Sequence, residues 1–246
     1  SMLKPSVPDS HYPMLGAREV FMHASHRWSV WAGAICIVLG FGALFVGKVI
    51  MYPTALIPGS LLDRLRAEPA AWEWSHRIMT VGFVLLLPAC VSLWGALRSK
   101  SPILSWLGAL LLGLGAAMSI GQFALDFAYL VAAQNLPPDA GQAFVDAMLA
   151  HPFAHAAFYE VPNLSGIGVL LLAIAMLRQG RAWWLAGAVV ALTIASSLVE
   201  KQFGPIGSRI TVGVQFLGFT LAAWRMARAA PVTSPALAPA SYPAST

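Results

Sequence analysis

Long runs of apolar residues, separated by short polar stretches, fill most of the chain between Trp28 and Ala227. A helix needs about 20 mainly apolar residues to cross the hydrocarbon core of a bilayer. Six segments meet or approach this length, namely Trp28–Met51, Ile78–Leu97, Ile103–Ala133, Phe153–Leu177, Ala182–Val199 and Ile206–Ala227. The pattern therefore predicts an all-α, polytopic membrane bundle of six transmembrane helices, formed by residues 28–228. Residues 1–27 are predicted as a cytoplasmic segment, and residues 229–246 as a disordered, proline-rich tail.

Glycines and polar stretches add detail to this bundle. Glycines recur in the first and third predicted spans, for example at Gly40, Gly47, Gly108 and Gly115. Small residues let helix backbones approach closely, so these two helices are predicted to lie centrally. The polar stretch 51–75 is expected to carry a short helix around residues 61–66. Residues 134–151 are interpreted as a long loop.

The positions of Lys and Arg orient the predicted bundle. Most of the 15 Lys and Arg residues lie on the side of the membrane that holds both termini, and residues 134–151 carry none. Cytoplasmic loops are enriched in positive charge, so both termini are predicted to be cytoplasmic. We expect a multi-pass protein of the plasma (inner) membrane.

Composition excludes the soluble classes of protein. Hydrophobic residues make up 58% of the chain, charged residues only 10%, and the mean hydropathy is +0.71. Globular domains carry roughly 25% charged residues, so this chain has too few to cover a soluble surface. The net charge of +5 comes from scattered pairs beside apolar runs, which indicates membrane topology and no nucleic-acid partner. The two cysteines lie inside apolar runs and indicate neither a disulfide framework nor a redox pair.

Polar and ionisable residues gather towards one end of the predicted spans. At a rise of 1.5 Å per residue, Asp126, Glu160, His76 and Arg209 each fall near the outer membrane boundary, on different helices. Ionisable residues at membrane depth are candidate functional sites, so we predict a pocket open towards the outer leaflet. The catalytic candidates are Asp126 and Glu160. The substrate-binding candidates are His76, Gln122, Phe123, Phe127, His155, Tyr159, Asn163 and Arg209.

Acid–base chemistry on a lipophilic substrate is the first function that this pocket suggests. A carboxyl group among aromatic rings can stay protonated near neutral pH. Asp126 or Glu160 can then donate a proton to an alkene or epoxide of an isoprenoid or another lipid. Small membrane-bound isoprenoid cyclases are similar in size and composition. The alternative for either carboxylate is a structural salt bridge with Arg209.

A zinc-dependent membrane hydrolase is the second possibility. His151 and His155 stand at HxxxH spacing, which places two imidazoles on one face of a helix, and His76 can supply a third ligand. These three histidines resemble the zinc sites of the alkaline ceramidase and adiponectin-receptor superfamily, which implies Zn²⁺ as the cofactor. Here the HxxxH pair opens the fourth span, and Pro152 disfavours helical geometry at His151.

Two further alternatives leave the reaction open. His76 and His155 can serve as axial ligands of a haem, or the pocket can bind a lipophilic small molecule without changing it. Expected partners are membrane lipid and that small molecule, and the oligomeric state is open. Charge at the membrane boundary costs little, so Glu200 with Lys201 or Arg209 fits a boundary ion pair better than a site.

The layout resembles a widespread family of bacterial six-helix membrane proteins that is described only as a domain of unknown function. The similar features are His76-Arg77 before the second span, the long third span through Gln122 and Asp126, and the aromatic entry to the fourth span at His155. They extend over about residues 28–228. The resemblance implies the fold and assigns no activity.

Overall fold

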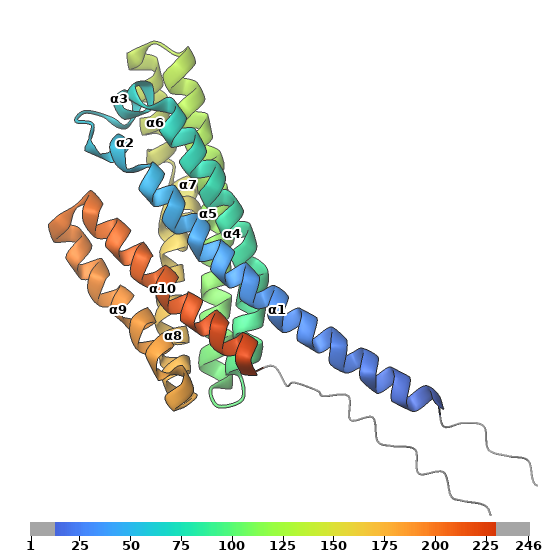
Figure 1. The fold of residues 1–246 in the computed structure, drawn as a ribbon. Helices are drawn as coiled ribbons and strands as arrows, with labels where there is room; N and C mark the ends of the chain where they lie inside the picture. The colour runs from blue at the N-terminus through green and yellow to red at the C-terminus, as the bar shows by residue number, and fades with distance from the viewer. Residues whose placement is uncertain (1–12, 230–246) are drawn as a thin grey trace, which may run out of the picture.

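A computed structural model describes the backbone of residues 13–229 and the side chains of residues 28–196, 204 and 206–229. Every element in this part of the chain is helical (Figure 1). In chain order these are α1 (Pro13–Ile50), α2 (Tyr52–Leu56), α3 (Leu61–Ala67), α4 (Pro69–Leu97), α5 (Pro102–Asn135), α6 (Pro138–Ala150), α7 (Pro152–His155), the π-helical η1 (Ala156–Glu160), the 3₁₀ turn η2 (Val161–Asn163), α8 (Leu164–Arg178), α9 (Arg181–Phe203) and α10 (Pro205–Ala229). The predicted disordered tail lies almost wholly outside the described residues.

Five stretches of the described chain are long and apolar enough to cross a membrane. They are Trp28–Ile50, Pro69–Leu97, Pro102–Asn135, Pro152–Arg178 and Ile206–Ala229. The fifth predicted span corresponds to α9, whose described apolar stretch, Arg181–Ser196, is shorter. The predicted all-α membrane bundle is therefore confirmed through five of its six spans.

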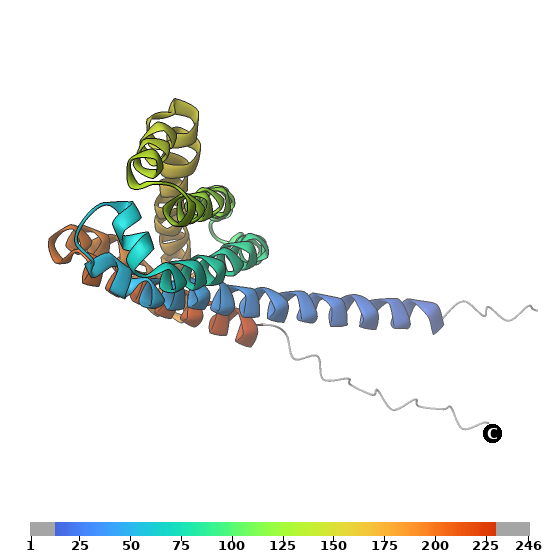
Figure 2. The same ribbon diagram turned by 90° about the horizontal axis from the view of Figure 1, so that it is seen from above.

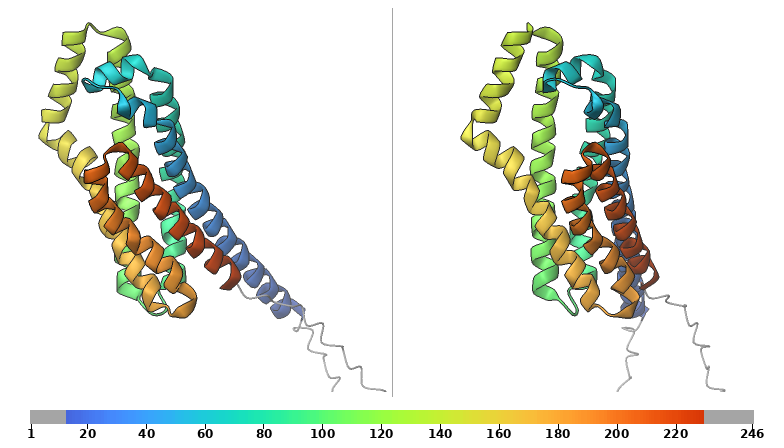
Figure 3. Two further views of the ribbon diagram at one scale, coloured as in Figure 1. Left: turned by 60° about the vertical axis from the view of Figure 1, so that its left-hand side comes forward. Right: turned by 90° about the vertical axis from the view of Figure 1, so that its left-hand side faces the viewer.

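The long helices pack side by side in a ring. Within the described chain, α1 contacts α4 and α10, α5 contacts α4 and α8, and α9 lies between α8 and α10. Figure 3 shows α4 and α5 continuing past the ends of α9 and α10 to the end of the molecule that carries α2, α3 and α6. We call this the cap end. Figure 2 shows α6 and α7 on the side of α5 away from α1.

Glycines allow the closest helix contacts in this ring. A Cβ atom added to Gly82 of α4 would lie 2.9 Å from the backbone oxygen of Gly40 in α1. A Cβ atom on Gly168 of α8 would lie 2.5 Å from the backbone nitrogen of Leu112 in α5. No side chain fits at either distance, and the facing glycines are Gly40 in α1 and Gly108 in α5. The prediction that the first and third spans lie centrally is not met, because the described long helices form a ring in which each contacts two neighbours.

Two hydrophobic cores lie at different levels of the molecule. The bundle core lies between the helices of the ring and includes the stacked rings of Phe41 and Phe219, whose centroids are 4.1 Å apart. The cap core lies at the cap end, where α3 and α6 cover the ends of α4 and α5, and consists of Leu62, Leu65, Trp72, Tyr129, Leu130, Ala133 and Val145. The 34 residues of α5 extend about 51 Å, well beyond a hydrocarbon core of about 30 Å, so this helix reaches from one core to the other.

Local hydrogen bonds fix the cap. The predicted helix around residues 61–66 is confirmed as α3, which begins with a capping box between Ser60 and Asp63. The hydrogen bonds from the Ser60 side chain and backbone hold the pKa of Asp63 below its ordinary value. Nε of Arg66 donates to the backbone oxygen of Ala133 at 2.9 Å and joins α3 to the end of α5. The prediction of a long loop at residues 134–151 is wrong, because α6 occupies most of this stretch and buries Val145 in the cap core.

Candidate functional site

A buried histidine–aspartate pair lies between α4 and α5, where the bundle core meets the cap core. Nε2 of His76 is 3.3 Å from Oδ2 of Asp126. His76 is 2% exposed and Asp126 is 7% exposed. The sequence reasoning placed both residues at one depth on neighbouring helices, and the structure brings them into direct contact.

Aromatic rings enclose this pair. The Trp72 ring stacks on His76 with centroids 4.2 Å apart, and its Nε1 donates to the backbone oxygen of Asp126 at 3.4 Å. Phe123 meets the imidazole edge-on at 4.9 Å, and Phe127 does so at 6.2 Å. The pair therefore has an apolar surrounding in which an unpartnered charge would be costly.

The second ring nitrogen of His76 faces the backbone of its own helix. Nδ1 is 2.8 Å from the backbone oxygen of Trp72, which only accepts, and 3.1 Å from the Ser75 hydroxyl oxygen, which can donate or accept. The Ser75 hydroxyl donates to the same carbonyl at 2.8 Å. Nε2 faces the Asp126 carboxyl group at 3.3 Å, so the two side chains form a buried acid–base pair inside the protein.

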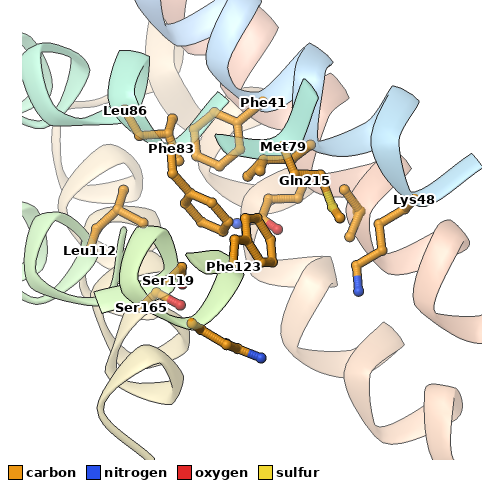
Figure 4. Close-up of a pocket in the computed structure, with 13 residues that line it drawn as sticks. Phe41, Lys48, Met79, Phe83, Leu86, Leu112, Ser119, Phe123, Ser165 and Gln215 are labelled. Atoms are coloured by element: carbon orange, nitrogen blue, oxygen red, sulfur yellow. The ribbon is translucent and has the colours of Figure 1, made fainter. Parts of the chain in front are cut away.

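A cavity of about 240 Å³ lies next to this pair, inside the ring of helices. Its apolar wall consists of Phe41, Leu44, Met79, Phe83, Leu86, Leu112, Phe123 and Val212, and its polar lining consists of Lys48, Ser119, Gln122, Ser165 and Gln215. Figure 4 shows the rings of Phe83 and Phe123 in the middle of the view, with Leu112, Ser119 and Ser165 on one side and Lys48 on the other. Mainly apolar walls with a few polar groups are typical of sites that bind small molecules.

Phe123 connects the cavity with the buried pair. Its side chain lines the cavity, its ring meets His76 edge-on, and it lies 5.5 Å from the ring of Phe83. Along each helix the pair is only about one turn from the cavity, because Met79 follows His76 by three residues and Phe123 precedes Asp126 by three. Gln122 and Phe123, both predicted to bind substrate, do line this cavity.

The predicted site also included His155, Tyr159, Glu160 and Asn163, and the structure does not place these around the cavity. His155 and Glu160 pair with each other at 3.6 Å, with side chains 52% and 66% exposed. The His155 ring lies against Tyr159, with centroids 5.9 Å apart. Asn163 is exposed and donates to the backbone oxygen of Tyr159. In the structure, therefore, neither Glu160 nor Asp126 lines this cavity, and Glu160 pairs with His155 instead.

One contact links this exposed group to the cap. The hydroxyl groups of Tyr159 and Tyr129 lie 3.0 Å apart, and Tyr129 is fully buried in the cap core. Tyr159 thus fastens η1 to α5.

The three histidines predicted to bind zinc do not come together. His151 is the N-cap of α7 with an extended backbone, and its Nδ1 accepts from the backbone nitrogen of Ala154. Pro152 at the first helical position explains why the HxxxH spacing does not place His151 on the same helix face as His155. Among the residues whose placement is described, no three His, Cys, Asp or Glu side chains are grouped closely enough to share a metal ion.

The two histidines predicted as axial haem ligands, His76 and His155, direct ring nitrogens at different neighbours. His76 directs its nitrogens at Trp72 and Asp126, whereas Nε2 of His155 faces Glu160.

Arg209 contacts the short helix α2 at the cap end. Its guanidinium carbon is 3.1 Å from the centroid of the Tyr52 ring, a cation–π contact between α10 and α2. The side chain of Glu200, the other member of the suggested boundary pair, lies outside the described residues.

Lys48, Ser165 and Gln215 were not among the predicted site residues. Lys48 is the one charged residue of the first apolar run, and that signal was available in the sequence. Ser165 follows the η2 turn, and nothing in its neighbourhood of the sequence marks it as facing a cavity.

Comparisons of the chain with protein-family models, with curated proteins and with solved structures find no match.

Proposed function

We propose that the chain crosses the plasma membrane six times, with α9 as the sixth span and both termini in the cytoplasm. The position of α9 between α8 and α10 supports this topology, because a ring partner of two spanning helices shares their depth. Arg98 lies over Trp94 and Arg228 over Trp224, a pairing suited to the cytoplasmic interface. The cap then faces the extracytoplasmic side.

We further propose that the protein is an enzyme that performs acid–base chemistry on a lipophilic small molecule, an isoprenoid or another lipid. The observation that carries this proposal is the enclosed pair of His76 and Asp126, about one helical turn from a cavity with mainly apolar walls. A buried acid and base in contact can donate a proton to a bound molecule or accept one from it.

Each residue has a defined task in this mechanism. The backbone oxygen of Trp72 contacts Nδ1 of His76, which keeps Nε2 directed at Asp126. Asp126 is the proton donor or acceptor, and His76 stabilises whichever charge the transfer leaves. Phe123 must turn aside for a ligand atom to reach Asp126, and Phe83 then forms the facing wall. Glu160 has no task here, because it is exposed and paired with His155.

The second candidate function is binding without chemistry. It is favoured by one observation, that the Phe123 ring contacts His76 on the side of the cavity and so covers the pair. In that case His76 and Asp126 hold α4 and α5 together beside a ligand site.

The test compares two conservative variants in lipid nanodiscs. The molecule that co-purifies with wild-type protein is identified by mass spectrometry, and its conversion is followed in wild type, Asp126→Asn and Glu160→Gln. We expect Asp126→Asn to lower turnover at least about 100-fold, the usual contribution of a general acid or base, with ligand still bound. Glu160→Gln should retain turnover. Conversion by Asp126→Asn at the wild-type rate would refute the proposed catalysis, and a bound but unconverted molecule in wild type would favour the binding function.

A further inference from the structure

The cavity lining has an unequal supply of hydrogen-bond donors and acceptors. Gln122, Gln215 and Ser165 can each donate or accept, so they adapt to many ligands. Lys48 only donates, and no Asp or Glu lines the cavity. Lys48 is also engaged within the protein, but an ammonium group carries three N–H donors and can bind a ligand in addition.

The apolar wall and the volume of the cavity restrict the size and polarity of the rest of the ligand. Phe41, Phe83 and Phe123 offer three aromatic rings, and the cavity volume of about 240 Å³ is below that of many drug-sized sites. A short apolar body therefore fits, with its polar end near Lys48. Charge-assisted hydrogen bonds between an ammonium and a carboxylate are roughly twice as strong as neutral ones, so a carboxylate is the best partner for this lining.

We propose that the ligand of this cavity is a lipophilic carboxylate whose acid group is bound by Lys48 of α1. This inference rests on the proposed ligand-binding function and names the class of its substrate. It predicts that the site discriminates between molecules of equal length by the charge of their polar end. A cationic amine is disfavoured, because it meets an ammonium and no carboxylate lines the cavity.

Three ten-carbon probes test the proposal: decanoate, decan-1-ol and decylamine, each measured by equilibrium binding to wild-type protein in nanodiscs at pH 7, with empty nanodiscs subtracted. We expect decanoate to bind about tenfold more tightly than decan-1-ol, with decylamine weakest. Lys48→Met should remove this preference, and Lys48→Arg should retain it. Lys100→Met is the matched control, because Lys100 lies in the α4–α5 turn and donates to the backbone oxygen of Gln179.

The outcomes separate this inference from the function on which it rests. Ser165→Phe, checked for folding by size-exclusion chromatography and thermal melting, is designed to fill the cavity. If no probe binds saturably, or if binding survives this substitution, both proposals fail. If binding is saturable and blocked but decan-1-ol or decylamine equals decanoate, or if Lys48→Met keeps the preference, only the carboxylate inference is overturned.

Discussion

Two histidine–carboxylate pairs in this protein have the same chemistry and opposite surroundings. His76 and Asp126 lie 3.3 Å apart with side chains 3% and 10% exposed, whereas His155 and Glu160 lie 3.6 Å apart with side chains 52% and 66% exposed. Distance alone does not distinguish them. The protein encloses the first pair and leaves the second exposed at its surface, so the energetic and chemical consequences of a contact depend on what surrounds it.

Removing one member of each pair should give the largest difference. Asp126→Ala leaves His76 buried without its partner, and breaking a buried pair typically costs about 3–5 kcal/mol. Reversible unfolding in mixed micelles should show that loss in the free energy of unfolding. A loss below about 1 kcal/mol, the range of an exposed pair, would contradict the enclosure described here.

The enclosure itself can be weakened without touching either charge. Trp72→Phe keeps an aromatic ring against His76 but removes the Nε1–H donor to the backbone oxygen of Asp126. We expect a loss of about 1–2 kcal/mol, because a buried carbonyl oxygen then lacks one of its donors. Trp74→Phe is the control, since Trp74 lies on the same helix and is 57% exposed. Equal effects of the two substitutions would argue against a specific role for Trp72.

The exposed pair should contribute little. Glu160→Ala is expected to change the free energy of unfolding by at most about 0.5 kcal/mol, and salt should reduce even that. Unfolding measured at low and high ionic strength provides the check. A large, salt-independent loss would mean that His155 and Glu160 are enclosed by lipid or by another subunit.

The smallest effect concerns Asp63 in the cap, which water surrounds. Its pKa is lowered by hydrogen bonds from Ser60, so the folded state favours the carboxylate. The resulting stabilisation of α3 is present above the ordinary aspartate pKa of about 3.9 and is lost as pH falls through the lower pKa of the folded protein. The protection factors of the α3 amides, which are exchange rates corrected for the intrinsic pH dependence of exchange, should therefore fall only in acid. Ser60→Ala should remove that pH dependence, and an unchanged acid response would contradict the capping role.

The fold was largely predictable because lipid imposes a simple demand on sequence. Every span must be apolar for most of its length, and that requirement is visible without an alignment. The helix within residues 134–151 was harder to predict from the sequence, because α6 lies in the cap and buries only a few positions such as Val145. Pro138 at its start and the spacing of Gly141 and Val145 were the available signals for a helix.

Only part of the candidate site was predictable. Counting 1.5 Å per residue gives the depth of a side chain but not the direction in which it faces. For Asp126 this was enough, since α5 is regular and His76 lies opposite at the same level. For Glu160 the count from Leu177 passed through the 3₁₀ turn η2 with Pro162 and ended in the π-helical η1, where the number of residues per turn differs from that of an α-helix. Beyond that point an α-helical count assigns the wrong face.

This change of helix type also bears on how the two halves of the protein are joined. Of the described helices, α4 and α5 run unbroken from the bundle core into the cap core, while α1 stops at Ile50 and the fourth span is interrupted between Ala156 and Asn163. Any tilting of the cap should therefore pivot on the α4–α5 pair, and the interrupted segment should take up the strain. His76 and Asp126 would then lie on that pivot, where movement is least, so such tilting should preserve their 3.3 Å contact.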